Sequence, residues 1–343
     1  MRRSARLAAI GLVLSLAAAP AGAEELDRVR VGVIGLISDA PLFIAQHEGY
    51  FRAQRIEVAF IPFPAGPAMV APLGTGELDV AAGASSAGLF NAALRGIAVK
   101  IVADKASTPP GPSYMPLLVR KDLVESGRVK SFADLKGLRV AEAGRGGSPG
   151  STLNAILRQG GLAYDDVEHV PNLAYPQHVT ALANRAIDAS ITTEPSATEA
   201  IEAGYAVRFS DGSAYPDQEV AVLLYGGDFI AKHRDAGERF MVAYIEGLRF
   251  YAQAISGGYL RGPKAGAVID ILAAEGEIKD KALLGRLVAN GVNPDGHVNE
   301  ASLRTDLAFY RAQNLISGPV AVEDLVDASF VEAALKQLGP WQP

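Results

Sequence analysis

The sequence predicts an α/β fold, because short apolar runs rich in β-branched residues alternate with segments of helical periodicity along most of the chain. Two segments rich in Pro, Gly and Ser, 105–116 and 209–219, interrupt this alternation and indicate connections between two lobes. The stretches 73–79 and 182–188 share one spacing, a helix end followed by a turn and an Asp that opens a strand. We therefore expect two similar α/β lobes.

The first series of elements starts with a strand around 29–33 and a helix that begins after Ser38 and Asp39, which are N-cap residue types. Pro41 suits the first turn of this helix, and Gly49 suits its end. Further strands are expected at 56–61, 78–82 and 99–103, with helices between them.

The second series has expected strands at 117–119, 138–141, 167–170 and 188–192, separated by helices. After the second break, apolar residues at helical spacing predict a largely helical C-terminal part, with the aromatic residues in its core. The predicted organisation is one lobe from 24–112 and 216–343, a second lobe from 113–215, and a hinge near 104–116 and 209–221.

The first 23 residues have the pattern of a secretory signal. Three arginines in the first six residues precede an apolar run over 7–19, and a small-x-small cleavage site follows at 21–23. An apolar run of roughly a dozen residues is too short to span a bilayer. We expect cleavage after Ala23 and release into the periplasm; the alternative, a buried N-terminal helix, fits this pattern less well.

Composition excludes several classes of protein. The chain has 32 basic and 38 acidic residues, and removal of the predicted signal leaves 29 basic against 38 acidic, a net charge of −9. Such an acidic protein is a poor partner for nucleic acid or anionic membranes. Cysteine is absent, which excludes disulfides, thiol catalysis, thiolate metal sites and a lipid anchor on cysteine. We expect a monomer without a cofactor.

The glycine-rich stretch GRGGSPGST at 144–152 lacks three catalytic or nucleotide motifs. The dinucleotide pattern G-x-G-x-x-G fails at Pro149, and the chain has no Gly-Lys-Ser/Thr phosphate loop. The hydrolase frame G-x-S-x-G does occur around Ser148, but Pro149 has no N–H to serve an oxyanion hole. A secreted hydrolase is therefore the disfavoured alternative.

The same stretch predicts a helix start, with Ser148 at the N-cap and Pro149 in the first turn. The N–H groups of residues 150–152 would then be exposed, and no acid lies in that turn, so an anion could bind there. The alternative is an ordinary solvated helix start. Arg145 either clamps a carboxylate or sulfonate or points to water.

An ordered set of motifs resembles a known family. The motifs PLFIAQHEGYF, TGELDVAAG, FADLKGLRVAEAG, GGLAYDDVEHV and ALANRAIDASITTEPSATEAIEAGYAV are similar, in order and spacing, to those of periplasmic substrate-binding proteins of nitrate/sulfonate/taurine (NitT/TauT) ABC transporters. The thiamine-pyrimidine-synthase-like proteins share the fold. The resemblance implies a type II periplasmic-binding fold, with two lobes joined by a two-crossover hinge and a ligand in the cleft.

The resemblance also implies partners and a ligand class. The partner is an ABC permease in the inner membrane, and the ligand is a small organic anion, a sulfonate first and a carboxylate next, with nitrate and bicarbonate as further options. A neutral pyrimidine-like or aromatic ligand is the alternative. The synthase relatives carry a cysteine-rich iron site, which this chain cannot form, so no enzyme activity is carried over.

Ligand contacts implied by the family lie in the loops after the strands. In the first lobe they are Ser38, Asp39, Ala40, Leu42, Gly66, Pro67, Ser85 and Ser86. In the second lobe they are Gly147, Ser148, Ser151, Thr193 and Glu194, and Tyr114 and Tyr215 lie at the two breaks. Loop Ser and Thr residues often only cap a helix or close a turn, which is the alternative for each. Glu194 is either a framework residue or a partner for a ligand donor.

The histidines and acids give no metal site. None of the five histidines is paired with another at a metal-ligand spacing such as H-E-x-x-H. We therefore expect no metal ion.

Overall fold

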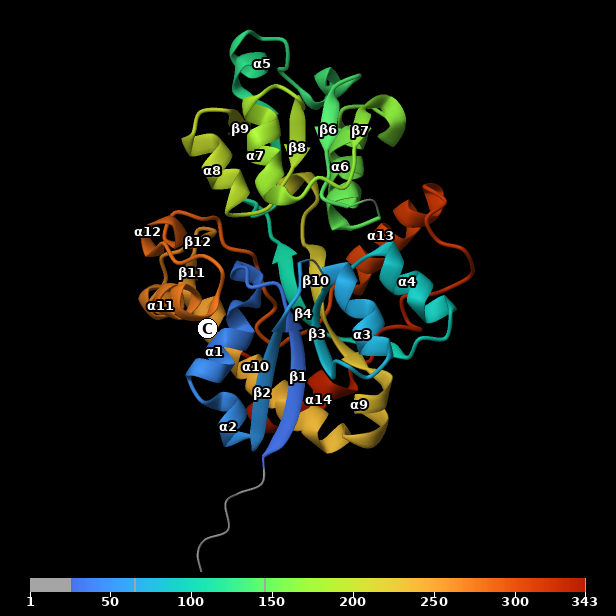
Figure 1. Cartoon of the computed structure of the whole chain (residues 1–343), viewed down its shortest axis with the longest axis vertical. Helices are drawn as coiled ribbons and strands as arrows, with labels where there is room; N and C mark the ends of the chain where they lie inside the picture. Colours follow the sequence, from blue (N-terminus) through green and yellow to red (C-terminus); the bar gives the residue numbers. More distant parts are fainter. Residues whose placement is uncertain (1–25, 65, 145, 343) are drawn as a thin grey trace, which may run out of the picture.

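The computed structural model describes residues 26–64, 66–144 and 146–342. They form two α/β lobes stacked along the long axis of the molecule, each built on a five-stranded sheet (Figure 1). The two lobes and the two connections between them confirm the predicted fold class. The signal predicted at 1–23, its cleavage after Ala23 and the side chain of Arg145 lie outside the described residues and stay predictions.

The first sheet has the order β2-β1-β3-β10-β4. Its strands are β1 (Asp27–Val33), β2 (Ile56–Pro62), β3 (Val80–Ala84), β4 (Val99–Thr108) and β10 (Gln218–Gly226). Strand β1 is parallel to β2 and β3, whereas β10 is antiparallel to β3 and β4. The chain thus leaves the first sheet after β4, builds the second lobe, and returns through β10.

Strand β10 is an exception to the prediction that the chain is largely helical after the second break. All nine of its residues are buried, because β10 lies inside the sheet between β3 and β4. A strand buried on both faces has a continuous apolar run and lacks the alternation that identifies half-exposed strands. Strand β4 likewise extends to Thr108, beyond the predicted start of the first break.

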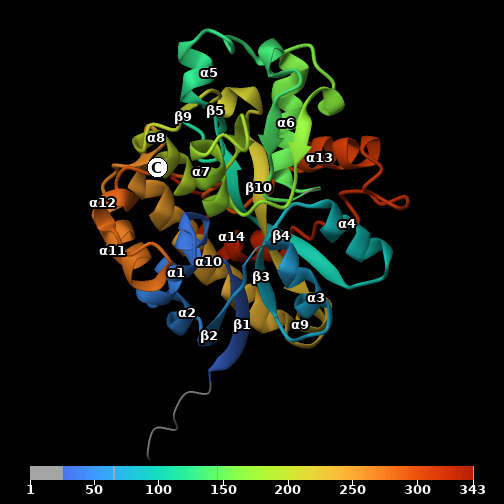
Figure 2. The same cartoon turned by 45° about the horizontal axis from the view of Figure 1, so that its top comes forward.

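Helices cover both faces of the first sheet. They are α1 (Ala40–His47), α2 (Tyr50–Ala53), α3 (Val70–Gly74), α4 (Ala87–Leu94), α9 (Gly227–Lys232), α10 (Arg234–Ala254), α11 (Ala265–Glu275), α12 (Lys281–Leu284), α13 (Glu300–Ala312) and α14 (Ser329–Leu338), with a small hairpin of β11 (Ile255–Ser256) and β12 (Tyr259–Leu260). The predicted core residues Phe240, Met241 and Tyr244 of α10 are fully buried. Helix α13 packs against α4, β10 and α6, and so reaches the second lobe (Figure 2).

The second sheet has the order β7-β6-β8-β5-β9. Its strands are β5 (Leu117–Arg120), β6 (Arg139–Ala141), β7 (Glu168–Val170), β8 (Ala189–Ile191) and β9 (Ala206–Arg208), and its helices are α5 (Lys121–Glu125), α6 (Ser148–Gln159), α7 (Tyr175–Ala183) and α8 (Ser196–Glu202). The four strands predicted in this segment are confirmed within about two residues at their ends.

The repeated spacing in the sequence corresponds to a repeated ion pair. Asp79 precedes β3 and accepts hydrogen bonds from the backbone N–H of Arg30 at 2.8 Å and from its guanidinium at 2.7 and 2.9 Å. Asp188 precedes β8 and accepts from the backbone N–H and guanidinium of Arg139, each at 3.0 Å. Each aspartate therefore ties its strand to an arginine of the neighbouring parallel strand.

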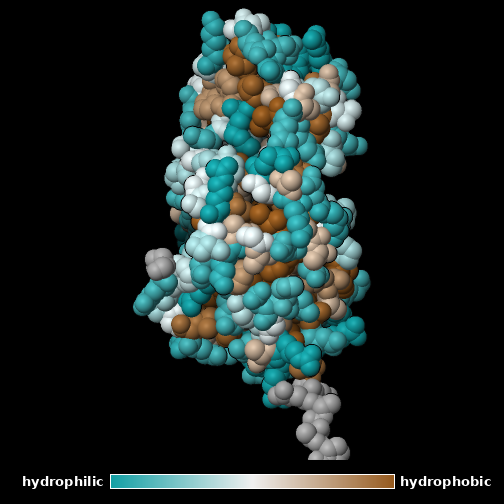
Figure 3. All heavy atoms as spheres, turned by 90° about the vertical axis from the view of Figure 1, so that its left-hand side faces the viewer, coloured by the Kyte–Doolittle hydropathy of each residue, from teal (hydrophilic) through white to brown (hydrophobic). Residues whose placement is uncertain are grey.

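The face of the molecule that carries α11 and α12 is mainly hydrophilic. Figure 3 shows hydrophilic side chains over most of the face that carries α11 and α12, with hydrophobic atoms visible between them. Tyr205 is the large hydrophobic side chain classed as exposed in the described part of the chain. Across 26–64, 66–144 and 146–342, no helix has both the length and the hydropathy needed to cross a bilayer.

Candidate ligand-binding site

A pocket of about 310 Å³ lies where the two lobes meet, and we call it the interlobe pocket. The first lobe supplies residues from the ends of β1, β3 and β4, and the second lobe supplies the start of α6 and residues near Tyr175 and Glu194. The crossovers supply Tyr114 and the first residues of β10. The pocket therefore lies at the carboxyl ends of parallel strands, where ligands bind in open α/β sheets.

Nine of the fifteen predicted ligand contacts line the interlobe pocket. They are Ser38, Gly66, Pro67, Ser86, Tyr114, Gly147, Ser148, Thr193 and Glu194. The other six, Asp39, Ala40, Leu42, Ser85, Ser151 and Tyr215, do not line this pocket.

Packing and hydrogen bonding explain why five of these six lie elsewhere. Ala40 and Leu42 belong to α1 and are fully buried in the core, and Ser85 is also fully buried. Ser151 and Tyr215 both donate to one oxygen of Asp306 on α13, at 2.5 and 2.7 Å. Their hydroxyl groups therefore connect α6 and the second crossover to α13.

A buried ion pair lies at the first-lobe wall and was missed in the sequence. The ammonium of Lys105 in β4 lies 2.8 Å from Asp39 Oδ1 and donates to Ser38 Oγ at 2.9 Å. Asp39 Oδ2 accepts the backbone N–H groups of Ile34 and Gly35 at 2.8 and 2.7 Å. Lys105 has three N–H donors, one of which is hydrogen-bonded to Ser38, and it lines the pocket.

The sequence signal for Lys105 was present but was assigned to a linker. The charged pair of Asp104 and Lys105 interrupts a strand whose other residues are mostly apolar or small. Because 105–116 is rich in Pro, Gly and Ser, the strand was predicted to end at residue 103. A charged residue inside a buried strand is the pattern that would have indicated a site.

Two helix N-termini, one from each lobe, meet at the pocket. Ser86 caps α4, since its Oγ accepts the N–H of Leu89 at 3.3 Å, and Gly88 in the first turn lines the pocket. The backbone N–H of Ala87 donates to the carbonyl of Gly146 at 2.8 Å, which joins the lobes directly. The N-terminal end of a helix favours negative charge, so this junction suits an anionic group.

The start of α6 differs from the prediction in two ways. Gly147 is the N-cap, and the Ser148 hydroxyl donates to the carbonyl of Val220 at 3.3 Å and does not cap the helix. Residues 150–152 are buried, and the N–H of Gly150 donates to Gly147. Glu142 lies so close that a Cβ on Gly150 would come within 2.8 Å of its carboxylate. The first turn of α6 therefore has a neighbouring acid that the local sequence does not reveal.

Glu194 is hydrogen-bonded within the protein, which agrees with its interpretation as a framework residue. Its Oε1 accepts from the guanidinium of Arg208 at 2.8 Å, and its Oε2 accepts the N–H of Thr198 at 2.9 Å. In contrast, the buried hydroxyl of Thr193 has no hydrogen-bond partner among the described residues. Thr193 therefore offers a polar group to an occupant of the pocket.

Apolar and aromatic residues form the rest of the wall. Ile34, Leu36, Ile37 and two prolines lie on the first-lobe side, and Tyr114 and Tyr175 lie toward the second lobe. Burial raises the pKa of both tyrosines, so their phenols are neutral at physiological pH. Tyr175 was not identified from the sequence, because the end of α7 could be predicted but its start at Tyr175 could not.

The remaining chemistry of the lining comes from Ser148 and the apolar walls. Ser148 Oγ is bonded to a backbone carbonyl and not to a basic side chain, and Pro149 beside it has no N–H. Among the described residues, no group of three or more His, Cys, Asp or Glu side chains is placed to hold a metal ion. The pocket presents a few hydrogen-bond donors within apolar walls, which is typical of a small-molecule site.

Comparisons with known proteins give a family and a fold. Residues 22–254 match the sequence profile of the NMT1-like family. A protein from Escherichia coli, named as an aliphatic sulfonates-binding protein, is 28% identical over 172 residues, which are 49% of this chain and 50% of that protein. The chain thus spans about half the length of this curated relative in the match.

Solved structures with the same fold include binding proteins and an enzyme. The alkanesulfonate-binding protein SsuA of Xanthomonas axonopodis, bound to MOPS, has a TM-score of 0.69 at 20% identity, over 89% of this chain and 99% of that one. The nitrate-binding protein NrtA of Synechocystis has a TM-score of 0.73 at 13% identity, over 92% and 90%. The desulfurization enzyme DSZB has a TM-score of 0.64 at 16% identity, over 91% and 99%. At these identities the likeness shows the fold alone.

Proposed function

The chain belongs to the NMT1-like family, and from this premise we propose that it is the periplasmic solute-binding component of an ABC importer. It captures a small organic anion in the interlobe pocket and delivers it to a permease in the inner membrane. In this proposal residues 1–23 are the export signal, residues 24–112 and 216–343 form one lobe, and residues 113–215 form the other. The mature protein acts as a monomer without a cofactor.

The main support for this proposal is that hydrogen-bond donors from both lobes border the interlobe pocket. The ammonium of Lys105, the hydroxyl of Thr193 and the N-terminal ends of α4 and α6 all border the same cavity. These groups come from both lobes, so a ligand that contacts all of them stabilises the closed arrangement. A micromolar dissociation constant requires about 8 kcal/mol, which a few charge-assisted hydrogen bonds and apolar contact supply after the cost of closure.

The charge of the lining narrows the ligand class to an anion with one charged group, a sulfonate first and a carboxylate next. Lys105 already pairs with Asp39, so this pair adds no net charge to the pocket. The two helix N-termini add about half a positive charge each, and Glu142 lies near one of them. A single anionic group matches this lining, and the apolar and tyrosine walls suit an apolar or aromatic body.

A neutral pyrimidine-like or aromatic ligand is the second candidate. The observation that favours it is the same pairing of Lys105 with Asp39, because a compensated cation can serve as a hydrogen-bond donor to a neutral acceptor. Tyr114 and Tyr175 would then supply the contact with the ring.

A thermal-shift screen of the mature protein tests the function and separates the candidates. The compounds are alkanesulfonates, carboxylates, inorganic anions and pyrimidines, with Lys105→Gln as the matched variant. A ligand present at about a hundred times its dissociation constant adds about 2.7 kcal/mol of stability. We expect an anion to stabilise the wild type but not Lys105→Gln, whereas a pyrimidine ligand would stabilise both.

Two results would contradict the proposal. One is stabilisation by phosphate-bearing nucleotides alone, which the pocket is not built to hold. The other is turnover of an ester or amide that is lost in Ser148→Ala, because this would assign the site to the hydrolase class.

A further inference from the structure

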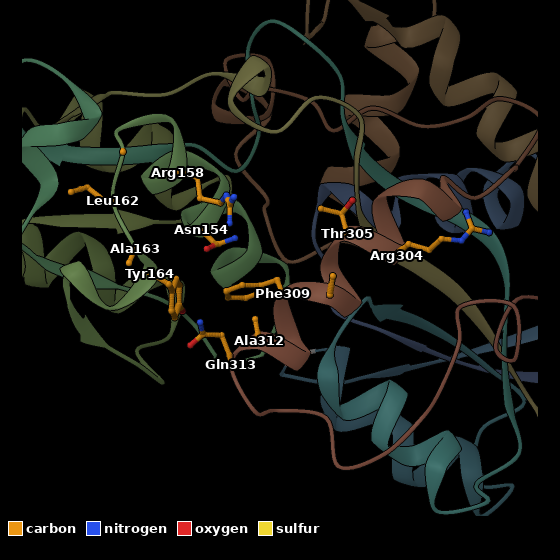
Figure 4. A pocket seen from close by; sticks show the side chains of 12 residues that line it. Asn154, Arg158, Leu162, Ala163, Tyr164, Arg304, Thr305, Phe309, Ala312 and Gln313 are labelled. Atoms are coloured by element: carbon orange, nitrogen blue, oxygen red, sulfur yellow. The ribbon is translucent and has the colours of Figure 1, made fainter.

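Asp306 lies on α13 where this first-lobe helix packs against α6 of the second lobe, and its side chain is fully buried. The outer side of this contact is a groove of about 930 Å³ (Figure 4). In that view Phe309 of α13 points toward Tyr164 of the second lobe, and the two rings lie 4.9 Å apart. Asp306 therefore lies at the contact between the two lobes.

One oxygen of Asp306 gathers donors from two parts of the chain outside its own helix. Asp306 Oδ1 accepts the hydroxyl of Ser151 on α6 at 2.5 Å and the hydroxyl of Tyr215, in the second crossover, at 2.7 Å. Beside them, Thr152 of α6 donates to Gln218 of β10 at 2.6 Å. Asp306 Oδ2 is buried and has no hydrogen-bond partner among the described residues. A proton on Oδ2 would remove the charge and leave both bonds at Oδ1 in place.

Among the residues that the structure describes, no cation forms an ion pair with Asp306. The groups that face it are the hydroxyls of Ser151 and Tyr215, the amide of Gln218, and the more distant Glu219 of β10 and Tyr310 of α13. Burial raises the pKa of Asp306 to about 7, against the opposite effect of its hydrogen bonds. Burial also raises the pKa of the neighbouring carboxyls Asp104 and Glu219, which face each other within the first sheet.

We propose that Asp306 positions α6 in the closed form and that closure of the lobes takes up a proton at this carboxyl. Ser151, which Asp306 holds, lies one turn along α6 from Gly147 and Ser148 in the pocket wall. Through Ser151, Asp306 fixes the ligand-facing end of α6 against the first lobe. The inference rests on the proposed function, in which the lobes close around a ligand.

The sign of the pH dependence follows from burial. Opening separates α6 from α13 and hydrates Asp306, so the pKa of its carboxyl falls toward the ordinary value of about 4. The closed form then binds the proton more tightly than the open form, and lower pH favours closure. With pKa values of about 7 and about 4, the ratio of closed to open protein falls about tenfold between pH 6 and pH 8.

The test measures closure without a ligand. The chain has no cysteine, so Glu125→Cys on α5 and Asp228→Cys on α9 place one nitroxide label on each lobe at exposed positions. Pulsed electron paramagnetic resonance then gives the interlobe distance distribution at pH 6, 7 and 8. We expect the closed population to fall with rising pH in this labelled protein and to be independent of pH after Asp306→Asn, which is neutral and has nearly the same shape.

Further variants separate Asp306 from its neighbours. Glu219→Gln alters the neighbouring carboxyl pair, which lies within the first-lobe sheet, and is expected to retain the pH response. Ser151→Ala leaves Asp306 in place and is expected to lower the closed population at each pH, so it tests the contact even if Asp306→Asn fails to fold.

Three outcomes would overturn the inference. They are a closed population that does not change between pH 6 and 8, an Asp306→Asn variant that keeps the full response, and a Glu219→Gln variant that loses it. Because no ligand is used, failure here leaves the ligand-binding proposal standing. Failure of the thermal-shift screen, in turn, would not alter the pH response of the interlobe distance.

Discussion

The two lobes share a framework device and differ where they face the pocket. Arg30 with Asp79 in the first lobe and Arg139 with Asp188 in the second make the same combination of backbone and guanidinium hydrogen bonds. At the pocket, however, the first lobe presents the ammonium of Lys105. The repeated spacing therefore encodes the scaffold, whereas unrepeated residues determine which groups line the pocket.

Loss of Lys105 should have the largest effect, because it removes the ammonium that the first lobe presents at the pocket. Lys105→Met leaves Asp39 buried without its cation, and we expect the free energy of unfolding to fall by about 3–5 kcal/mol and anion binding to be lost. Adding Asp39→Asn should recover much of the stability, since an amide oxygen can still accept the N–H groups of Ile34 and Gly35. Urea unfolding and the thermal-shift screen measure the two effects.

A matched variant in the second lobe is Arg208→Met, which removes the cation from Glu194. It should cost stability but leave an anion shift in the thermal screen, because Lys105 is intact. Anion binding of wild-type strength in the Lys105→Met, Asp39→Asn double variant would contradict the role given to Lys105.

Acid should destabilise the second lobe through His178. Its Nδ1 lies 2.7 Å from Ser190 Oγ and its Nε2 lies 2.8 Å from the carbonyl of Leu173, while burial lowers its pKa to about 4. Because this value is below the ordinary 6.5, stability is present above pH 6.5 and is lost as the pH falls toward 4. At pH 5 the loss is about 2 kcal/mol.

Hydrogen exchange at pH 6.5 and pH 5, corrected for intrinsic rates, checks this sign lobe by lobe. Protection of β6 and β8 should decrease at pH 5 relative to the first sheet, and His178→Gln should remove this decrease. An equal decrease in both sheets would show that His178 is not its source.

The two Arg–Asp pairs should differ in strength. Asp188 also accepts at 3.0 Å from Arg120, whose side chain is only 9% exposed, whereas the Arg30 side chain beside Asp79 is 41% exposed. We expect Asp188→Ala to cost about 2–3 kcal/mol and Asp79→Ala about 1 kcal/mol, because solvent screens the more exposed pair. Urea unfolding of both variants gives the order, and a larger cost for Asp79→Ala would contradict it.

The two helix starts at the pocket should show the smallest difference. Ser86 caps α4, so Ser86→Ala should cost about 1 kcal/mol. Ser148 lies inside the first turn of α6 and does not cap it, and its hydroxyl makes one long hydrogen bond to the Val220 carbonyl, so Ser148→Ala should cost about 0.5 kcal/mol. Thermal unfolding of the two variants measures the difference; equal costs would show that Ser148 stabilises the helix start by another route.

Most of the fold could be predicted because its elements follow local rules. Strand β1, the turn at Gly49 and the four predicted strands of the second lobe follow from alternation, β-branched residues and helix stop signals. Strand β10 could not be placed in this way, since its partners β3 and β4 are more than a hundred residues away in the chain. Its burial depends on the tertiary fold and not on its own pattern.

The site was predictable only in part, for a related reason. The loops that follow the strands were predicted correctly, and Ser38, Ser86 and Ser148 in these loops line the pocket. Which hydroxyl faces a ligand and which faces another helix depends on distant residues. Asp306 is 155 positions from Ser151 and 91 from Tyr215, and nothing in the local sequence of either residue indicates that partner.

The hydrogen bond from Ala87 to Gly146 across the two lobes bears on how quickly an occupant leaves. Separation of the lobes must break this bond whichever molecule is inside, so part of the activation barrier for release is a property of the protein alone. Residence times of chemically different guests should then vary less than their affinities would indicate, and a weak guest would still be retained until the next opening.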